Sequence, residues 1–125
     1  MALCLLLQLT GTIALRAEQV ATDSLKITVT EGTNMAAALS PDRKTIAIDL
    51  QGTTWTLPIN GGAARPVTDA LGDCHQPAWS PDGNWIVFHS FWDGNYHIWM
   101  VRKDGSQRQQ LTSGPYDDRE PHWSP

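Results

Sequence analysis

The sequence predicts an all-β fold, and two observations carry this prediction. The first is a recurring motif: Ser-Pro-Asp stands at residues 40–42 and 80–82, and Ser-Pro stands again at 124–125. The copies are 40 and 44 residues apart, a period typical of repeat architectures. The second is that an alternating stretch rich in β-branched and aromatic side chains follows the first two copies, as expected for half-buried strands.

Each repeat predicts four short strands, with repeats starting near residues 35, 76 and 120. One strand leads into each Ser-Pro-Asp turn, and the next covers 45–50 or 85–90. A third covers 54–57 or 97–101 after a turn at 51–52 or 93–95, and a fourth covers 65–68 or 109–112 after an Asn-Gly or Asp-Gly pair. Four antiparallel strands in about 40 to 45 residues form the blade of a β-propeller. The sequence therefore predicts a β-propeller fragment: two four-stranded blades plus the start of a third.

The Ser-Pro-Asp-Gly motif has a local physical reason. Proline presets φ at the first central position of the turn, aspartate bonds back to the backbone, and glycine accepts a positive φ. Arg43 stands where the second copy has Gly83. We therefore expect either a type I geometry or mild strain at Arg43.

Four of the six tryptophans recur at equivalent repeat positions. Trp79 and Trp123 precede the turn motif, while Trp55 and Trp99 share one position of the third strand. Large aromatic side chains at repeated positions favour packing between neighbouring sheets over a functional role.

Length and composition permit one folded domain. The 125 residues are 41% hydrophobic and 18% charged, which is typical of a globular chain. Nine Lys or Arg stand against 13 Asp or Glu without a basic cluster, so we expect no nucleic-acid partner.

The N-terminus is typical of a signal peptide over residues 1–17. Residues 2–15 are almost wholly apolar, and Arg16 follows them. This run is too short to span a bilayer as a helix but suits a signal peptide cleaved after Ala17. We therefore expect a periplasmic or secreted protein whose mature domain is 18–125, with Cys74 as its single cysteine and no stable membrane span. A buried strand or helix is the alternative for this segment.

Residues 79–83, Trp-Ser-Pro-Asp-Gly, followed by Trp-Ile-Val-Phe at 85–88, resemble the WD40-like Pro-Asp repeats of TolB-like propellers. The resemblance covers about residues 30–125. Within this group the N-terminal propeller of exported metal-dependent amidohydrolases is most similar, in Glu-Gly-Thr-Asn-Met at 31–35 and Asp-Gly-Asn-Tyr-His-Ile-Trp at 93–99. That likeness implies a hydrolase domain downstream, with a divalent metal such as zinc there and none in this segment. Two alternatives stay open: a non-enzymatic periplasmic scaffold that binds envelope proteins, and the propeller domain of a serine peptidase.

The segment itself contains no motif for catalysis, cofactor binding or metal binding. It has no His-x-His pair for a metal and no Gly-x-Ser-x-Gly elbow for a serine nucleophile. His89 and His97 fall on successive predicted strands, where we expect a pair on the sheet surface rather than a metal site. Cys74 and His75 are adjacent on an extended chain and should point to opposite faces, which argues against a nucleophile and its base.

The polar loops before each first strand are the best candidates for contact with a partner. Residues 69–76 and 116–120 precede the second and third first strands, and in a propeller such loops face the central channel at one rim. The partner would be a downstream catalytic domain or an envelope protein. The alternative is solvated loops with ion pairs, one of them at Arg119. The predicted rim residues are His75, Gln76, Asp118, Arg119 and Glu120.

Overall fold

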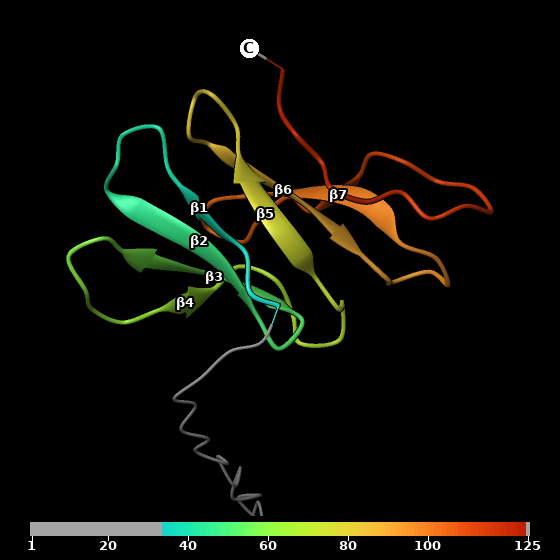
Figure 1. Ribbon diagram of the computed structural model, residues 1–125, viewed down its shortest axis with the longest axis horizontal. Helices are drawn as coiled ribbons and strands as arrows, with labels where there is room; N and C mark the ends of the chain where they lie inside the picture. Colours follow the sequence, from blue (N-terminus) through green and yellow to red (C-terminus); the bar gives the residue numbers. More distant parts are fainter. Residues whose placement is uncertain (1–33, 125) are drawn as a thin grey trace, which may run out of the picture.

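The computed structural model describes residues 34–124 and consists of two antiparallel four-stranded sheets set side by side (Figure 1). The predicted signal peptide lies outside the described residues. Within them, no helix has the length and apolar character needed to cross a membrane.

Both sheets are meanders in which each strand pairs with the next along the chain, as in propeller blades. This confirms the prediction of an all-β propeller fragment. The strands of the first sheet are β1 (Ala37–Leu39), β2 (Thr45–Leu50), β3 (Thr53–Pro58) and β4 (Arg65–Pro66). Those of the second are β5 (His75–Trp79), β6 (Trp85–Ser90), β7 (His97–Arg102) and β8 (Gln109–Gln110).

The fourth strand of each blade is shorter than predicted, because β4 and β8 contain only two residues each. In the first blade the backbone N–H of Thr54 donates to the hydroxyl of Thr68 at 2.8 Å. In a longer β4, a backbone carbonyl of that strand would accept this N–H instead. Thr112 accepts the N–H of Ile98 at 2.9 Å in the second blade. A side-chain acceptor thus replaces the backbone ladder at the same place in both repeats.

The two Ser-Pro-Asp turns have the same hydrogen bonds. In the second, Ser80 Oγ donates to Asp82 Oδ1 at 2.5 Å and accepts the N–H of Trp85 at 2.9 Å. In the first, the hydroxyl of Ser40 makes the equivalent bonds at 2.6 and 3.0 Å. These hydrogen bonds explain why Ser and Asp stand two residues apart in each motif.

Arg43 adopts the left-handed backbone conformation of its glycine counterpart. Its φ is 58°, close to the 69° of Gly83. A side chain with a Cβ is strained there, so the second of the two expectations for this turn is confirmed.

The blades meet through the inner strand of the second blade. β5 packs against β1, β2 and β3, and a core that includes Phe88, Ile86 and Val101 fills the space between the sheets. The indole N–H of Trp79 donates to the carbonyl of Ala38 at 3.1 Å across this interface. Trp123 makes the same bond to Ala78 at 3.2 Å, so residues 120–124 lie against the second blade as β5 lies against the first.

The two tryptophans of the third strands lie on different interfaces. Trp99 shares a sheet face with Phe88 and packs edge-on against Trp92, with ring centroids 4.8 Å apart. It therefore fills the space between the described blades, as predicted. Trp55 shares its face with Ile48, whereas the neighbouring Asp49 points toward the second blade. Trp55 therefore lies on the face of the first sheet that points away from the second.

We predict that Arg43→Gly stabilises the chain by about 1 kcal/mol, because glycine takes a positive φ without a Cβ clash. The measurement is the urea midpoint at neutral pH. Arg43→Ala is the control, since it removes the guanidinium but keeps the Cβ. Equal stabilisation by both variants would show that the side chain, and not the backbone, is the source of the effect.

Candidate functional site

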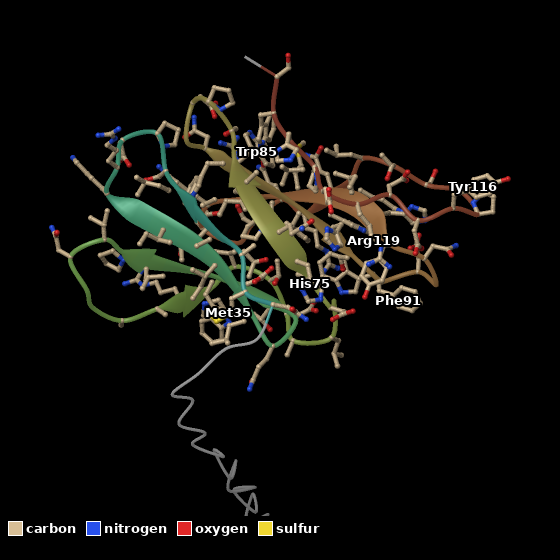
Figure 2. The ribbon with its side chains drawn as sticks, viewed as in Figure 1. Met35, His75, Trp85, Phe91, Tyr116 and Arg119 are labelled. Atoms are coloured by element: carbon tan, nitrogen blue, oxygen red, sulfur yellow. The ribbon has the colours of Figure 1, made fainter. Side chains whose placement is uncertain are left out.

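The candidate site is the end of the two sheets where β5 and β7 begin and β6 ends. We define the rim as residues 69–76, 91–96 and 113–120, and we call the opposite end, with the Ser-Pro-Asp turns, the turn end. Figure 2 shows His75, Phe91, Arg119 and Tyr116 on the rim and Trp85 at the turn end. The sequence prediction named two of these three loops and missed 91–96.

A buried carboxylate joins the two blades beneath the rim. Asp49 is 3% exposed and accepts the backbone N–H of Ala36 at 2.6 Å and that of Gln76 at 2.8 Å. Ala36 and Gln76 hold the same repeat position, so one carboxylate fixes the start of the inner strand in both blades. Gln76 reaches Asp49 through a bulge in β5 and a φ of 51°.

His75 is held at the rim by carboxylates. Its Nε2 lies 2.9 Å from Asp73 Oδ1, and its Nδ1 lies 3.8 Å from Asp49 Oδ2. The hydroxyl of Tyr96 donates to the other oxygen of Asp73. This hydrogen bond lowers the pKa of Asp73 and raises the pKa of Tyr96, because it favours the carboxylate and the protonated phenol.

Arg119 closes the same network from the loop after β8. Its guanidinium carbon lies 3.9 Å from the centre of the Tyr96 ring, and its Nη2 lies 3.1 Å from Asp117 Oδ2. The contacts therefore run without a break from His75 through Asp73 and Tyr96 to Arg119.

The carboxylate of Asp118 contacts a buried histidine and is not free to bind a partner. Its Oδ2 lies 3.3 Å from Nδ1 of His97, which is 2% exposed. Hydrogen bonds from Thr112 and His97 lower the pKa of Asp118. The backbone N–H of Asp118 also donates to the carbonyl of Tyr96 at 2.7 Å, so this loop is fixed to the hairpin between β6 and β7.

Glu120 repeats the backbone of Gln76. Its φ is 56°, and the two residues line one cavity of about 290 Å³ together with His122. Glu120 makes no hydrogen bond or ion pair with any residue between 34 and 124. The structure thus connects His75 to Arg119, sets Gln76 beside Glu120, and directs Asp118 to a buried histidine.

The predicted surface pair of His89 and His97 is wrong. His89 lies opposite Ile98 and His97 lies opposite Ser90 in the register of β6 and β7, so the two imidazoles are on opposite faces of the sheet. His89 instead packs against His75 and Tyr96, with ring centroids 5.6 and 5.4 Å away.

His89 is the counterpart of Asp49 in the second repeat. It is 5% exposed, and its Nδ1 has no hydrogen-bond partner among the described residues. Burial lowers the pKa of His89 to about 4, which keeps the ring neutral at physiological pH. A neutral, unpaired ring nitrogen at this position is a hydrogen-bonding group that the sequence prediction did not identify.

Cys74 lies in the core beneath the rim. The residue is fully buried, and burial raises the pKa of its thiol, so the thiol form is favoured over the nucleophilic thiolate. No group of three or more His, Cys, Asp or Glu side chains between residues 34 and 124 is arranged to hold a metal ion.

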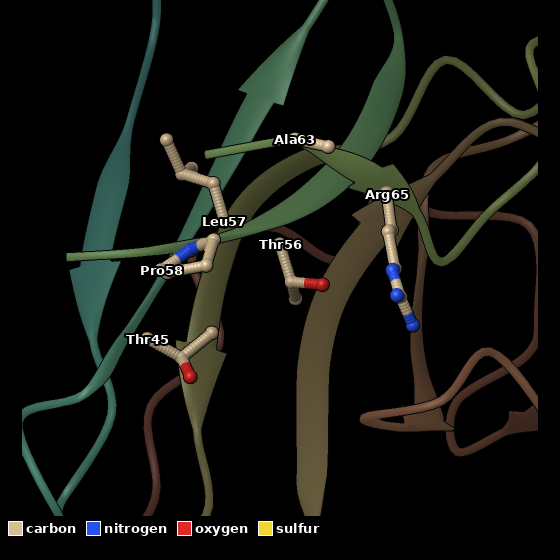
Figure 3. Close-up of a pocket in the computed structure, with 6 residues that line it drawn as sticks. All are labelled: Thr45, Thr56, Leu57, Pro58, Ala63 and Arg65. Atoms are coloured by element: carbon tan, nitrogen blue, oxygen red, sulfur yellow. The ribbon is translucent and has the colours of Figure 1, made fainter. Parts of the chain in front are cut away.

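A second cavity lies at the turn end, away from the rim. It measures about 300 Å³, and none of the predicted rim residues lines it (Figure 3). Its walls come from β2, β3 and the residues before and in β4: Thr45, Thr56, Leu57, Pro58, Ala63 and Arg65.

Comparison with known proteins identifies the class of fold. No family model matches the chain. A solved structure of a protein assigned as TolB from Agrobacterium tumefaciens superposes on 74% of this chain and 35% of its own, with a TM-score of 0.67 and 33% identity. TolB from Acinetobacter baumannii superposes on 62% of this chain and 21% of its own, with a TM-score of 0.53 and 23% identity, and supports the fold alone. The described residues are therefore blades of a β-propeller.

Sequence relatives support the same assignment. An uncharacterized protein of Agrobacterium fabrum is 39% identical over 71 residues, and a TolB homolog of Protochlamydia amoebophila is 40% identical over 52. The uncharacterized peptidase YuxL of Bacillus subtilis is 31% identical over 72 residues. These matches cover 57%, 42% and 57% of this chain, and 24%, 11% and 11% of the respective relatives. The propeller formed by this chain is TolB-like.

We predict that Asp49→Ala uncouples the starts of the two inner strands and destabilises the chain by about 2 kcal/mol, because two buried N–H groups lose a charged acceptor. Hydrogen exchange is the measurement: the amides of Ala36 and Gln76 should lose protection. Glu120→Ala is the control, since this carboxylate is exposed. Unchanged protection in Asp49→Ala would contradict the assigned role.

We further predict that stability falls as the pH drops from about 6.5 to about 4, because the unfolded chain binds a proton at His89 that the folded chain does not. His89→Gln should flatten this slope in urea midpoints measured across the window. The carboxylates with lowered pKa, such as Asp73, lose their contribution at lower pH, below about 3.8. An equal slope in the wild type and the variant would exclude His89 as its source.

Proposed function

We propose that this chain supplies non-catalytic blades of a TolB-like propeller, and that its rim binds another polypeptide. The supporting observation is that rim loops are fixed by internal contacts while large side chains stay exposed. Asp73 accepts a hydrogen bond from Tyr96 in the hairpin between β6 and β7, and Asp118 contacts His97 of β7. Leu71 and Tyr116 in the same loops are 89% and 80% exposed. A preorganised loop with exposed apolar groups loses little conformational entropy on binding.

Attachment to a metal-dependent amidohydrolase domain is our more specific proposal, and it rests on sequence resemblance. In that arrangement the rim contacts the catalytic domain, and hydrolysis belongs to residues outside this chain. A TolB-like scaffold that binds an envelope protein uses the same rim without a hydrolase. Both arrangements fit a periplasmic or secreted protein, in keeping with the apolar segment at residues 2–15.

A propeller that accompanies a serine peptidase is the second candidate, and the similarity to YuxL favours it. Translation of the coding DNA beyond residue 125 separates the candidates. A His-x-His motif with barrel strands supports the amidohydrolase, Gly-x-Ser-x-Gly supports the peptidase, and further Ser-Pro-Asp repeats alone support the scaffold.

The test of the binding face is site-specific photo-crosslinking in the full-length protein, expressed in its source organism. A photoreactive residue at position 71 or 116 should give the same discrete adduct, because both positions lie on the rim. The control is position 59 at the turn end, where Ile59 is 44% exposed. Adducts that form equally from position 59, or none from either rim position, would overturn the assignment of the rim as the binding face.

A further inference from the structure

Charge is unevenly distributed between the two ends of the molecule. Six of the ten Asp and Glu residues between 34 and 124 lie within the rim, where Arg119 is the single Lys or Arg. Five of the other six cations lie at the turn end: Arg43, Lys44, Arg65, Arg102 and Lys103. The sixth, Arg108, pairs with rim Asp69 at 3.0 Å and neutralises that carboxylate. The remaining rim carboxylates still outnumber Arg119, so the rim carries a negative potential that attracts a cationic ligand.

The rim also exposes apolar side chains between its carboxylates. Leu71 is 89% exposed, Phe91 is 46% exposed and Tyr116 is 80% exposed. The turn end also exposes apolar side chains, but Leu39 and Ile59 there are only 45% and 44% exposed, so the two most exposed large apolar side chains of residues 34–124 are both on the rim. Exposed apolar side chains that lie together mark binding surfaces. An inorganic cation would leave these side chains in water, whereas a polypeptide can cover them.

Arg119 shows how side chains of the rim bind a guanidinium group. Arg119 lies over Tyr96 and pairs with Asp117, so an aromatic face and a carboxylate hold its guanidinium together. Glu120 next to it has no partner among the described residues. Arg108 pairs with the rim carboxylate of Asp69 at 3.0 Å, so the rim carboxylates already hold two guanidinium groups. The rim still contains more carboxylates than cations, and Glu120 is among those left for a further cation.

His89 provides a second, independent observation, because it is a buried side chain against the rim whose ring nitrogen lacks a hydrogen-bond partner among the described residues. It is 5% exposed, its ring contacts His75 and Tyr96 of the rim, and its Nδ1 is unpaired. The equivalent Asp49 accepts N–H donors at the same repeat position. A neutral imidazole has one acceptor nitrogen, so with its proton on Nε2 the ring of His89 accepts a hydrogen bond at Nδ1, as the Asp49 carboxylate does, and then suits an N–H or ammonium donor.

We propose that the rim binds a cationic segment of its polypeptide partner, with Lys or Arg side chains among the rim carboxylates and aliphatic side chains against Leu71 and Phe91. This inference rests on the proposed function, because it specifies the chemistry of the partner. Nucleic acid and anionic lipid are excluded as occupants by the same negative charge.

The test uses a fluorescent octapeptide of alternating Lys and Leu, titrated into the full chain and followed by anisotropy. We expect saturable binding that weakens about tenfold between low salt and about 0.5 M salt, because salt screens exposed charges. The same peptide with Glu in place of Lys should not bind. Equal binding of the two peptides would overturn the proposal.

Charge-neutralising variants locate the binding surface. Asp93→Asn with Glu120→Gln should weaken binding of the Lys-Leu peptide about fivefold or more. Asp82→Asn with Asp104→Asn is the matched control, since it removes the same charge from the turn end and should leave the Kd within about twofold. An equal loss in both double variants would show a response to net charge alone and would overturn the rim as the site.

Failure of this inference can be told apart from failure of the proposed function. If positions 71 and 116 crosslink to a partner and the adduct persists in the Asp93→Asn, Glu120→Gln variant, the rim is a binding face but its partner is not cationic. If no rim adduct forms, the proposed function itself fails, whatever the octapeptide does.

Discussion

The arrangement of the rim depends on a carboxylate buried between two blades. Asp49 extends from the middle of the first sheet and accepts backbone N–H groups at the same repeat position in both blades. Removal of a charged acceptor from such a place leaves donors without partners, which is more costly than the loss of an exposed ion pair. The position of His75, and through Asp73 and Tyr96 that of Arg119, therefore follows from a contact that the surface does not reveal.

The repeat keeps the backbone constant and varies the side chains placed on it. The Ser-Pro-Asp turns share their hydrogen bonds, and Trp79 and Trp123 share their bond to the preceding inner strand. At the rim the same backbone positions carry different chemistry, since Gln76 corresponds to Glu120 and Asp49 corresponds to His89. The fold and the binding chemistry are thus specified by different positions of the repeat.

The sequence predicted the parts of the structure that depend on local pattern. The motif spacing and the alternation predicted the sheets, and the predicted second and third strands differ from the observed ones by at most one residue at an end. The length of the fourth strands was not predictable, because it depends on the hydroxyls of Thr68 and Thr112. The rim network was predicted only in part: the position before each first strand pointed to His75 and Arg119, whereas Asp73 and Tyr96 become partners only through the fold. The opposite faces of His89 and His97 follow from the strand register, which residue spacing alone does not fix.

The short outer strands limit the pairing of these blades with strands of other protein molecules. An exposed sheet edge is a template on which strands of another chain can add, and such addition leads to aggregation. β4 offers two residues, of which Pro66 has no N–H, and β8 offers only Gln109 and Gln110. The hydroxyls of Thr68 and Thr112 that end the ladder therefore also protect the outer sheet edges, because the strands they shorten offer an added strand few backbone N–H and C=O groups for pairing.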